Sequence, residues 1–354
     1  MVSDFLLYGA NGYTGRVIIE RALVAGLRPL LAGRNATELK ALADEHDLDH
    51  RAFGLDDGRA LDEALSDVGV VLHAAGPFAH TSAPMVEACM RTRTHYVDIT
   101  GELEIFERLQ RESGRARDAG IMLLPGAGFD VVPTDLLSAH LKRRLPGATH
   151  LRLAFYVRGG SISRGTLTTM VENMGRGGAV RIDGQITRVP PAWRTRTVDF
   201  GFGTRPVSVT TIPWGDVSTA YHSTGIPNVE VYARAGAAQR RMLTATRVLN
   251  KPLGWPPVQR VLKRWIRARV TGPSADQRRR AVSLIHGEAW DDAGGRVESR
   301  MRTPEGYALT AMTSVEVVRR VLTGDVKAGF QTPSLAYGAD WILGLAGVQR
   351  EDVA

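Results

Sequence analysis

The first 124 residues alternate short apolar runs with segments whose apolar residues recur every three to four positions. The short runs predict β-strands, and the recurring pattern predicts amphipathic helices. The expected strands are residues 5–8, 29–32, 51–53, 68–75, 96–99 and 121–124. The expected helices are residues 13–25, 36–46, 60–66, 83–93 and 103–117. Strands that alternate with helices run parallel and are joined by right-handed crossovers, so this half predicts an α/β doubly wound parallel sheet.

The second half of the chain lacks this regular alternation. Its apolar runs follow one another, and residues 291–295, Asp-Asp-Ala-Gly-Gly, form a hairpin-type turn between the last two. The expected strands are residues 151–157, 207–212, 228–234, 281–290 and 296–302. Helical patterns at residues 314–322 and 334–345 close the chain. We therefore expect a second α+β domain built on a largely antiparallel sheet.

A glycine-rich loop joins the first expected strand to the first expected helix. It consists of Gly9, Ala10, Asn11, Gly12, Tyr13, Thr14 and Gly15, with the spacing G-x-x-G-x-x-G. In such loops the first glycine permits a tight turn, the second lets the backbone approach a pyrophosphate, and the third lets helix and strand pack closely. The helix N-terminus adds N–H groups and a partial positive charge. This context predicts a Rossmann dinucleotide site formed by these seven residues.

The end of the second strand indicates which dinucleotide binds. NAD enzymes usually place an acidic residue there to bind the ribose hydroxyls. This chain instead has Gly33, Arg34 and Asn35. A carboxylate would repel a 2′-phosphate, whereas the planar guanidinium of Arg34 suits one. We therefore predict that these three residues bind NADP(H) in preference to NAD(H), the alternative being that Arg34 is only a solvated surface residue.

Small residues follow the next strands of the predicted sheet. Ala75, Gly76 and Pro77 end the fourth strand, and Thr100 and Gly101 follow the fifth. Ligands of open α/β sheets bind at the carboxyl edge of the strands. We expect these five residues to contact the cofactor, with Gly76 and Pro77 beside the ribose and nicotinamide. The alternative interpretation of this region is a plain strand-ending turn.

Two carboxylic acids at the same edge are candidates for the chemistry. Hydride transfer needs a proton source beside the nicotinamide, and Asp98 and Asp130 follow the fifth and sixth strands. An acid in a partly apolar site has a raised pKa and can act as a general acid, so both are predicted to be catalytic. The alternative role of Asp130 is to cap the helix that begins near Pro133, which is the preferred interpretation for Asp135. His73, in the fourth strand, is expected to belong to the core.

Four segments together resemble the saccharopine dehydrogenase-like reductases, in particular the branch of trans-acting enoyl reductases. They are residues 9–15, 74–78, 96–102 and 125–135. Residues 164–168 are similar to the family's entry into the substrate domain. The resemblance implies a Rossmann domain at residues 1–132 and a substrate and dimerisation domain at residues 133–330. It also implies a C-terminal helix at residues 331–354 that packs back on the Rossmann domain.

Several other catalytic motifs are absent from the sequence. No tyrosine is followed four positions later by a lysine, which excludes the Tyr-x-x-x-Lys relay of short-chain dehydrogenases. There is no P-loop, no H-E-x-x-H and no paired C-x-x-C, so we expect no metal. Cys89 is the only cysteine, which rules out a disulfide within the chain.

The net charge of +8 originates in one segment. Residues 239–280 hold twelve Lys or Arg and one acid, Asp276, giving +11, whereas the remainder is at −3. Within this segment, residues 258–270 combine amphipathic-helix spacing with a cationic face and Trp265. Such a helix can rest on an anionic membrane surface or dock an acidic carrier protein, the alternative being a lid with a solvated basic face. Nucleic acid is not an expected partner, because no recognition module accompanies the charge.

The expected location follows from the apolar segments. Residues 1–4 lead directly into the run that precedes the glycine loop, so we expect no secretory leader. No stretch approaches the roughly 20 apolar residues of a membrane span. The prediction is a cytoplasmic protein, with peripheral membrane contact as the alternative.

Two classes of function remain open at this point. The first is an NADPH-dependent reductase acting on an apolar, acyl-type substrate, small or carrier-bound, with C=C reduction favoured. Its runner-up is C=N reduction of a saccharopine-like substrate, whose carboxylates would need converging arginines such as Arg158, Arg164, Arg176 and Arg181. The second class is a non-catalytic NADP(H)-binding module. A homodimer through the second-domain sheet is a further expectation.

Overall fold

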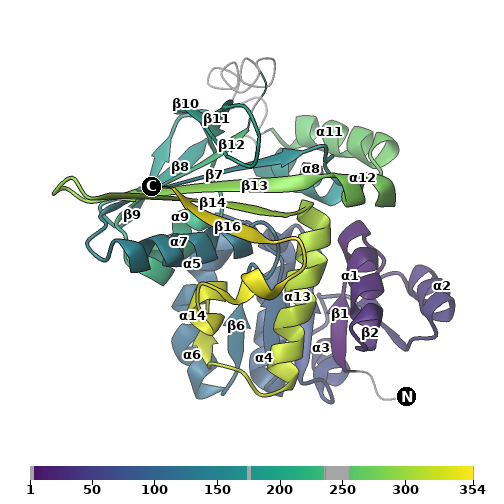
Figure 1. Cartoon of the computed structure of the whole chain (residues 1–354). Coiled ribbons are helices and arrows are strands. Elements are labelled where there is room, and N and C mark those ends of the chain that lie inside the picture. The colour runs from purple at the N-terminus through teal and green to yellow at the C-terminus, as the bar shows by residue number, and fades with distance from the viewer. Residues whose placement is uncertain (1–3, 174–176, 235, 237–254, 354) are drawn as a thin grey trace. The chain divides into compact units, whose positions relative to one another are not determined.

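The computed structural model describes residues 4–173, 177–234, 236 and 255–353, and the chain divides into two compact units (Figure 1). One unit comprises residues 1–132 and 307–336, and the other comprises residues 133–306 and 337–354. Arg176 and the first part of the basic segment, residues 239–254, lie outside the described residues.

In the first unit, the described residues form a seven-stranded parallel sheet in the order β15, β6, β5, β4, β1, β2, β3. The strands are β1 (Phe5–Tyr8), β2 (Pro29–Gly33), β3 (His50–Ala52), β4 (Val70–His73), β5 (His95–Asp98), β6 (Met122–Leu124) and β15 (Gly329–Phe330). The helices are α1 (Tyr13–Val24), α2 (Ala36–His46), α3 (Gly58–Leu65), α4 (Phe78–Thr92), α5 (Leu103–Arg111), α6 (Ser113–Asp118), α13 (Gly306–Leu322) and α14 (Pro333–Tyr337). The predicted doubly wound sheet is confirmed.

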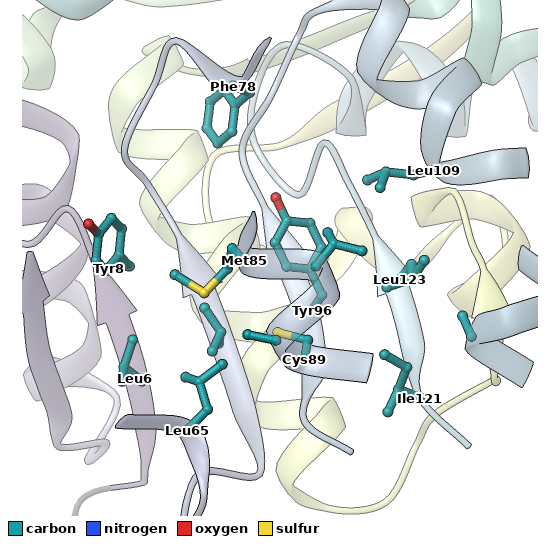
Figure 2. Packing of buried hydrophobic residues seen from close by; sticks show 14 of the residues in the cluster. Leu6, Tyr8, Leu65, Phe78, Met85, Cys89, Tyr96, Leu109, Ile121 and Leu123 are labelled. Atoms are coloured by element: carbon teal, nitrogen blue, oxygen red, sulfur yellow. The ribbon is translucent and has the colours of Figure 1, made fainter. Parts of the chain in front are cut away.

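The core of this unit explains why its strands are apolar throughout. Every residue of β1 and β4 is buried, as expected for parallel strands that helices cover on both faces. Figure 2 shows part of this core, in which Met85 and Cys89 of α4 and Tyr96 of β5 share one cluster with Leu6 of β1. The buried thiol of Cys89 is unpaired and serves as a small apolar side chain.

In the second unit, the described residues form a nine-stranded mixed sheet. Its strands are β7 (His150–Arg158), β8 (Gly178–Ile182), β9 (Gln185–Val189), β10 (Thr195–Val198), β11 (Val207–Thr211), β12 (Asn228–Arg234), β13 (Val282–Trp290), β14 (Arg296–Pro304) and β16 (Gln349–Val353). The helices are α7 (Val132–Arg144), α8 (Arg164–Asn173), α9 (Asp216–Thr224), α11 (Pro256–Arg269), α12 (Ala275–Arg280) and the short 3₁₀ helix η1 (Trp341–Gly344). The β12–β7 pair is parallel and the other pairs are antiparallel, which confirms the largely antiparallel sheet.

Helix α7 packs directly on this sheet. A Cβ at Gly287 of β13 would stand only 2.6 Å from Leu141 Cδ1 and 3.0 Å from Leu137 Cδ2. The absence of a side chain at position 287 therefore lets helix and sheet approach closely.

The predicted helix at residues 334–345 is wrong. Helix α14 ends at Tyr337, η1 covers only Trp341–Gly344, and β16 follows. Gly338 has φ +82°, a left-handed conformation that ends a helix. The apolar residues of this segment are spaced as in a helix, but the glycine interrupts them.

The C-terminal part of the chain is also divided differently from the expectation. Residues 307–330, expected in the second domain, belong to the first unit, and residues 337–354 belong to the second. Hydrogen bonds explain this division. The Thr313 hydroxyl of α13 donates to Ala127 O at 2.7 Å in the first unit, whereas β16 pairs with β14 in the second.

The described residues hold neither a membrane-spanning helix nor a cluster of metal-ligating side chains. None of their helices is both long and apolar enough to cross a membrane. Within the same residues, no group of three or more His, Cys, Asp or Glu is placed to hold a metal ion.

Candidate functional site

The candidate site of the first unit lies where the strand order reverses. Strands β2 and β3 follow β1 on one side of the sheet, and β4, β5 and β6 extend on the other. The loops after β1 and β4 therefore diverge at the carboxyl edge, which is where open α/β sheets bind ligands. A hydrogen bond from Ala74 N to Tyr8 O, 2.8 Å long, holds the two loops side by side at their start.

Glycine is required at two positions of the loop after β1. Gly9 has φ +89°, and a Cβ there would stand 2.9 Å from Ala74 C and Ala75 N. At Gly15 a Cβ would stand 2.4 Å from Gly9 O, so the third glycine lets α1 pack against its own loop. These are the roles that the sequence spacing predicts for a dinucleotide loop.

The N-terminus of α1 fits a phosphate. Its N-cap residue, Gly12, has no side chain to cap the helix, and the first turn holds no acidic residue. The first-turn amides and the helix dipole are therefore available to an anion. The aromatic ring of Tyr13 packs edge-on against Tyr307 of α13, with centroids 4.9 Å apart, so this side chain forms part of the protein framework.

A cavity of about 550 Å³ opens beside this loop. Its lining residues come from the ends of β1, β2 and β4 and are Tyr8, Gly9, Asn11, Gly33, Arg34, Asn35, Ala36 and Ala75. Arg34 is exposed, and no described residue forms a hydrogen bond or ion pair with it. A guanidinium directly after β2 that has no partner among the described residues fits the 2′-phosphate of NADP(H).

Two predicted cofactor side chains bind protein groups in the structure. The Asn35 side chain caps α2 by accepting a hydrogen bond from Glu38 N at 3.2 Å. The Asn11 amide donates to Glu38 Oε2 at 2.6 Å. Both residues still line the cavity, so their contact with a cofactor falls mainly to the backbone.

Two lining residues, Tyr8 and Ala36, were not predicted from the sequence. Tyr8 is the last residue of β1, and its hydroxyl donates to Phe53 O at 3.3 Å. The hydroxyl of Tyr8, at the end of the apolar run of residues 5–8, was the feature of the sequence that could have indicated its place in the cavity. Ala36 follows directly on Asn35 and has no signal of its own. Tyr307 is also missed, because nothing in the sequence links it to Tyr13.

The loops after β4 and β5 are held together by Glu102. Its two carboxylate oxygens accept hydrogen bonds from Phe78 N at 2.7 Å and Ala79 N at 2.9 Å. These are the first amides of α4, so Glu102 caps the helix from a neighbouring loop. The predicted cofactor residues Ala75, Gly76 and Pro77 lie immediately before this capped end. Glu102 thereby fixes the course of that loop.

Asp98 lies beneath the carboxyl edge and has no solvent-exposed surface. Its Oδ1 accepts hydrogen bonds from Thr100 N and Gly126 N, both at 2.9 Å, and its Oδ2 accepts one from the Tyr96 hydroxyl at 2.7 Å. Burial raises the pKa of Asp98 to about 6, although these hydrogen bonds oppose the rise. One carboxylate oxygen, Oδ1, thus joins the loops after β5 and β6, and the catalytic role expected for Asp98 stays a prediction.

The other predicted residues of these loops differ in exposure. Thr100 is fully buried and its hydroxyl accepts a hydrogen bond from Glu102 N at 3.1 Å, so its side chain is not placed to bind a cofactor. Gly101 and Asp130 are only half-buried. A Cβ at Gly101 would stand 2.9 Å from Asp130 Oδ2, which brings the loops after β5 and β6 together. Burial raises the pKa of Asp130 to about 7.

His73 is a core residue, as predicted. It is fully buried and surrounded by the rings of Tyr8, Phe78 and Tyr96. Its Nδ1 lies 3.2 Å from the Tyr96 hydroxyl. Burial lowers the pKa of His73 to about 3, so the ring is neutral at physiological pH.

Residues 5–124 match the family model described as the saccharopine dehydrogenase NADP binding domain. This segment is a saccharopine dehydrogenase NADP-binding domain. The resemblance expected from the glycine loop and the three later segments is thereby confirmed, and so is NADP as the cofactor of the domain. The domain carries the cavity and Arg34 described above.

Curated relatives match part of the chain. A trans-acting enoyl reductase of Mycobacterium leprae is 33% identical over 150 residues, which is 40% of this chain and 36% of the relative. A lipid droplet localized protein of Caenorhabditis elegans is 28% identical over 187 residues, which is 48% of this chain and 44% of the relative. The matches thus span less than half the length of either relative.

A solved structure is similar over the whole chain. The saccharopine dehydrogenase (L-Glu forming) of Saccharomyces cerevisiae is 13% identical and has a TM-score of 0.68, with 99% of both chains covered. At this identity the likeness shows the fold, and it confirms the combination of a Rossmann unit with a second mixed-sheet unit.

Proposed function

We propose that this chain is an NADPH-dependent oxidoreductase that reduces the C=C bond of an apolar, acyl-type substrate. The observation that carries the proposal is the cradle after β1. Its glycines leave room for a pyrophosphate, and the cavity beside it ends at an arginine without a partner among the described residues. The names of two relatives, a trans-acting enoyl reductase and a lipid droplet localized protein, support the acyl character of the substrate.

Different residues of the cavity and its loops bind different parts of the cofactor. The backbone of the Gly9–Gly15 loop and the first turn of α1 bind the pyrophosphate, and Arg34 binds the 2′-phosphate. Ala75, Gly76 and Pro77 border the ribose and nicotinamide. When bound, NADPH supplies a hydride, which leaves the substrate with a carbanion or enolate that must be protonated.

Asp130 is the residue that donates this proton. It lies at the carboxyl edge beside Gly101. A pKa of about 7 leaves a large fraction of its carboxyl groups protonated at neutral pH. A general acid works best when its pKa is near the working pH. The proton passes from the Asp130 carboxyl to the α-carbon or enolate oxygen, and the carboxylate is then reprotonated from solvent.

Asp98 has a positioning role in this scheme. It fixes Thr100 N and Gly126 N with one oxygen, and these amides begin the two loops that bring Gly101 and Asp130 together. The same carboxylate has no exposed surface from which to reach a substrate. Its effect on turnover is therefore indirect.

The geometry of Arg181 does not favour the saccharopine-like alternative. This arginine is buried, and its guanidinium donates to Val217 O at 2.8 Å and Gly184 O at 2.7 Å. It also lies over the Tyr221 ring at 4.2 Å. Arg181 is therefore occupied by protein groups and does not bind a substrate carboxylate.

Calorimetric titration with NADPH and with NADH tests the cofactor claim, and turnover tests the reaction. We expect NADPH to bind and its nicotinamide absorbance to fall with enoyl thioesters of increasing chain length. The matched imine panel should give no such loss. Turnover of imines but not of enoyl thioesters would replace C=C by C=N reduction. NADPH binding without turnover of either panel would favour a non-catalytic NADP(H)-binding module.

A further inference from the structure

Helix α11 exposes large apolar side chains that the proposed reaction does not use. In this helix Val261 is 69% exposed and Trp265 is 59% exposed. Trp255, the N-cap residue, is 60% exposed. The apolar residues of a helix on a globular protein normally face inward. Three large apolar side chains in open solvent at one helix therefore mark an interaction surface.

The inner face of the same helix is already occupied. Ile266 is buried, Gln259 donates to Val171 O of α8 at 3.1 Å, and Lys263 Nζ lies 2.6 Å from Glu172 Oε1. These contacts attach α11 to α8, its neighbour in the second unit (Figure 1). Of Val261, Trp265 and Ile266, only Ile266 is buried. The two exposed side chains are not needed to hold the helix in place.

Arginines flank the exposed apolar stripe on both sides. Helical spacing places Val261 and Trp265 one turn apart, with Arg260 and Arg264 along one side and Arg269 along the other. All three arginines are exposed, and none has a hydrogen bond or ion pair within the part of the chain that the structure describes. Helix α11 contains no acidic residue. The outer face therefore combines aromatic and apolar groups with unneutralised positive charge.

We propose that the outer face of α11, defined by Trp255, Arg260, Val261, Arg264, Trp265 and Arg269, binds the surface of an anionic phospholipid membrane. Tryptophan prefers the interface between headgroups and acyl chains, where its ring is in an apolar layer and its N–H stays in a polar one. Arginines beside it extend to lipid phosphates. A parallel orientation of the helix on the surface satisfies both kinds of side chain at once.

An acidic protein is the other partner that positive charge suits, but the apolar stripe favours the membrane. Charge complementarity with an acidic carrier requires the arginines alone. The exposed side chains of Trp255, Val261 and Trp265 would remain in water there unless the carrier presented a matching apolar groove. A lipid surface accepts both groups without such a match.

The test is sedimentation of the full-length protein with vesicles, at physiological ionic strength. We expect binding to vesicles of phosphatidylcholine with phosphatidylglycerol and little binding to phosphatidylcholine alone. The double variant R260A/R264A should lower the partition coefficient roughly 10- to 30-fold. Trp265→Ala should lower it roughly tenfold and should abolish the part of the binding that survives high salt.

A matched control separates this face from general positive charge. The double variant R111A/R205A removes two arginines that are equally exposed and have no partner among the described residues. It should leave vesicle binding within about twofold of the wild type. NADPH affinity, measured in every variant, shows that the fold is intact. The proposal would be overturned if the control variant lost vesicle binding equally or if the wild type did not bind anionic vesicles. Binding of an acidic acyl carrier protein in place of the vesicles would also overturn it.

Discussion

The carboxylate of Asp130 lies directly against the Cα of Gly101. A Cβ at position 101 would stand 2.9 Å from Asp130 Oδ2 and 3.0 Å from Asp130 Cβ. At such distances the two residues overlap, so one of them has to move. The contact joins the loop after β5 to the loop after β6, so it couples the position of the proposed acid to a glycine 29 residues away.

Gly101→Ala should therefore displace Asp130. We expect kcat to fall roughly 10- to 100-fold, because small displacements of a catalytic group have effects of this size. The NADPH dissociation constant should change by less than about threefold, since a phosphate contact is not involved. Gly114→Ala is the control, because a Cβ there meets nothing within 4 Å. An unchanged kcat in Gly101→Ala would remove Asp130 from the reaction.

The activity of the wild type should depend on the protonation of Asp130. With a pKa of about 7, the acid form is lost as pH rises, so kcat should decline through about pH 7. Asp130→Asn should lower kcat by roughly 100-fold or more and flatten the profile. The measurement is kcat at saturating substrate between about pH 5 and 9. Retention of the same declining limb in the Asn variant would assign it to another group.

The raised pKa of Asp130 also predicts how the stability of the fold varies with pH. The pKa of Asp130 is higher in the folded chain than the ordinary value of 3.8, so folding favours the protonated form. The stabilisation is complete below about pH 4 and is lost as pH rises through about 7. Wild-type unfolding free energy should fall over this window by ~4 kcal/mol more than that of Asp130→Asn. Urea denaturation of both proteins at several pH values measures the difference, and parallel curves would contradict the assignment.

Arg34→Ala should weaken NADPH binding without affecting NADH. A charge-assisted pair of guanidinium and phosphate accounts for roughly a 10- to 100-fold change in the dissociation constant. NADH lacks the 2′-phosphate and should bind the variant within about twofold of the wild type. The control is Lys40→Ala, which removes an exposed cation of the neighbouring helix α2. It should leave the affinities for NADPH and NADH unchanged. Calorimetry measures the dissociation constants of both nucleotides. An equal loss of affinity for NADPH and NADH would show that Arg34 does not bind the 2′-phosphate.

Substitutions of Asp98 separate a positioning role from proton donation. Asn keeps an acceptor for Thr100 N and Gly126 N, so Asp98→Asn should retain kcat within about tenfold. Alanine has no side-chain acceptor, so Asp98→Ala leaves the buried N–H groups of Thr100 and Gly126 unpaired. This should lower the unfolding free energy by about 3 kcal/mol. Kinetics and urea denaturation of the two variants form the test. Loss of all turnover in a well-folded Asp98→Asn would restore Asp98 as the acid.

The sequence predicted most of the first unit for a physical reason. The strands are buried on both faces, and such strands are apolar along their whole length and easy to recognise. Gly9, Gly15 and Arg34 were found because backbone approach and phosphate charge demand particular residue types at fixed spacings. In the second unit, the main strands were also visible, but the short strands β8, β9 and β10 and the edge strand β16 were not. Strand β16 is an example of why such strands escape detection. Its residues, Gln349–Val353, are largely polar.

The separate role of Asp98 could not be read from the chain. A carboxylate after a strand is equally compatible with catalysis, helix capping or loop fixation, and only its partners distinguish these roles. Tyr96 is two residues away and Gly126 is 28 residues away, so the decisive hydrogen bond depends on the neighbouring position of β5 and β6 in the sheet. The capping of α4 by Glu102 from another loop depends on the tertiary structure in the same way.

By itself, the sequence determined the doubly wound sheet, the dinucleotide loop and the arginine that suits a 2′-phosphate, because these follow from local periodicity, glycine conformation and charge. Tertiary structure decided that Asp98 is fully buried, that Asp130 is half-buried beside Gly101, and which face of α11 remains in solvent. These outcomes depend on contacts between residues far apart in the chain, such as Lys263 with Glu172. Periodicity identifies an apolar face, but only the neighbouring helix shows how much of that face is covered.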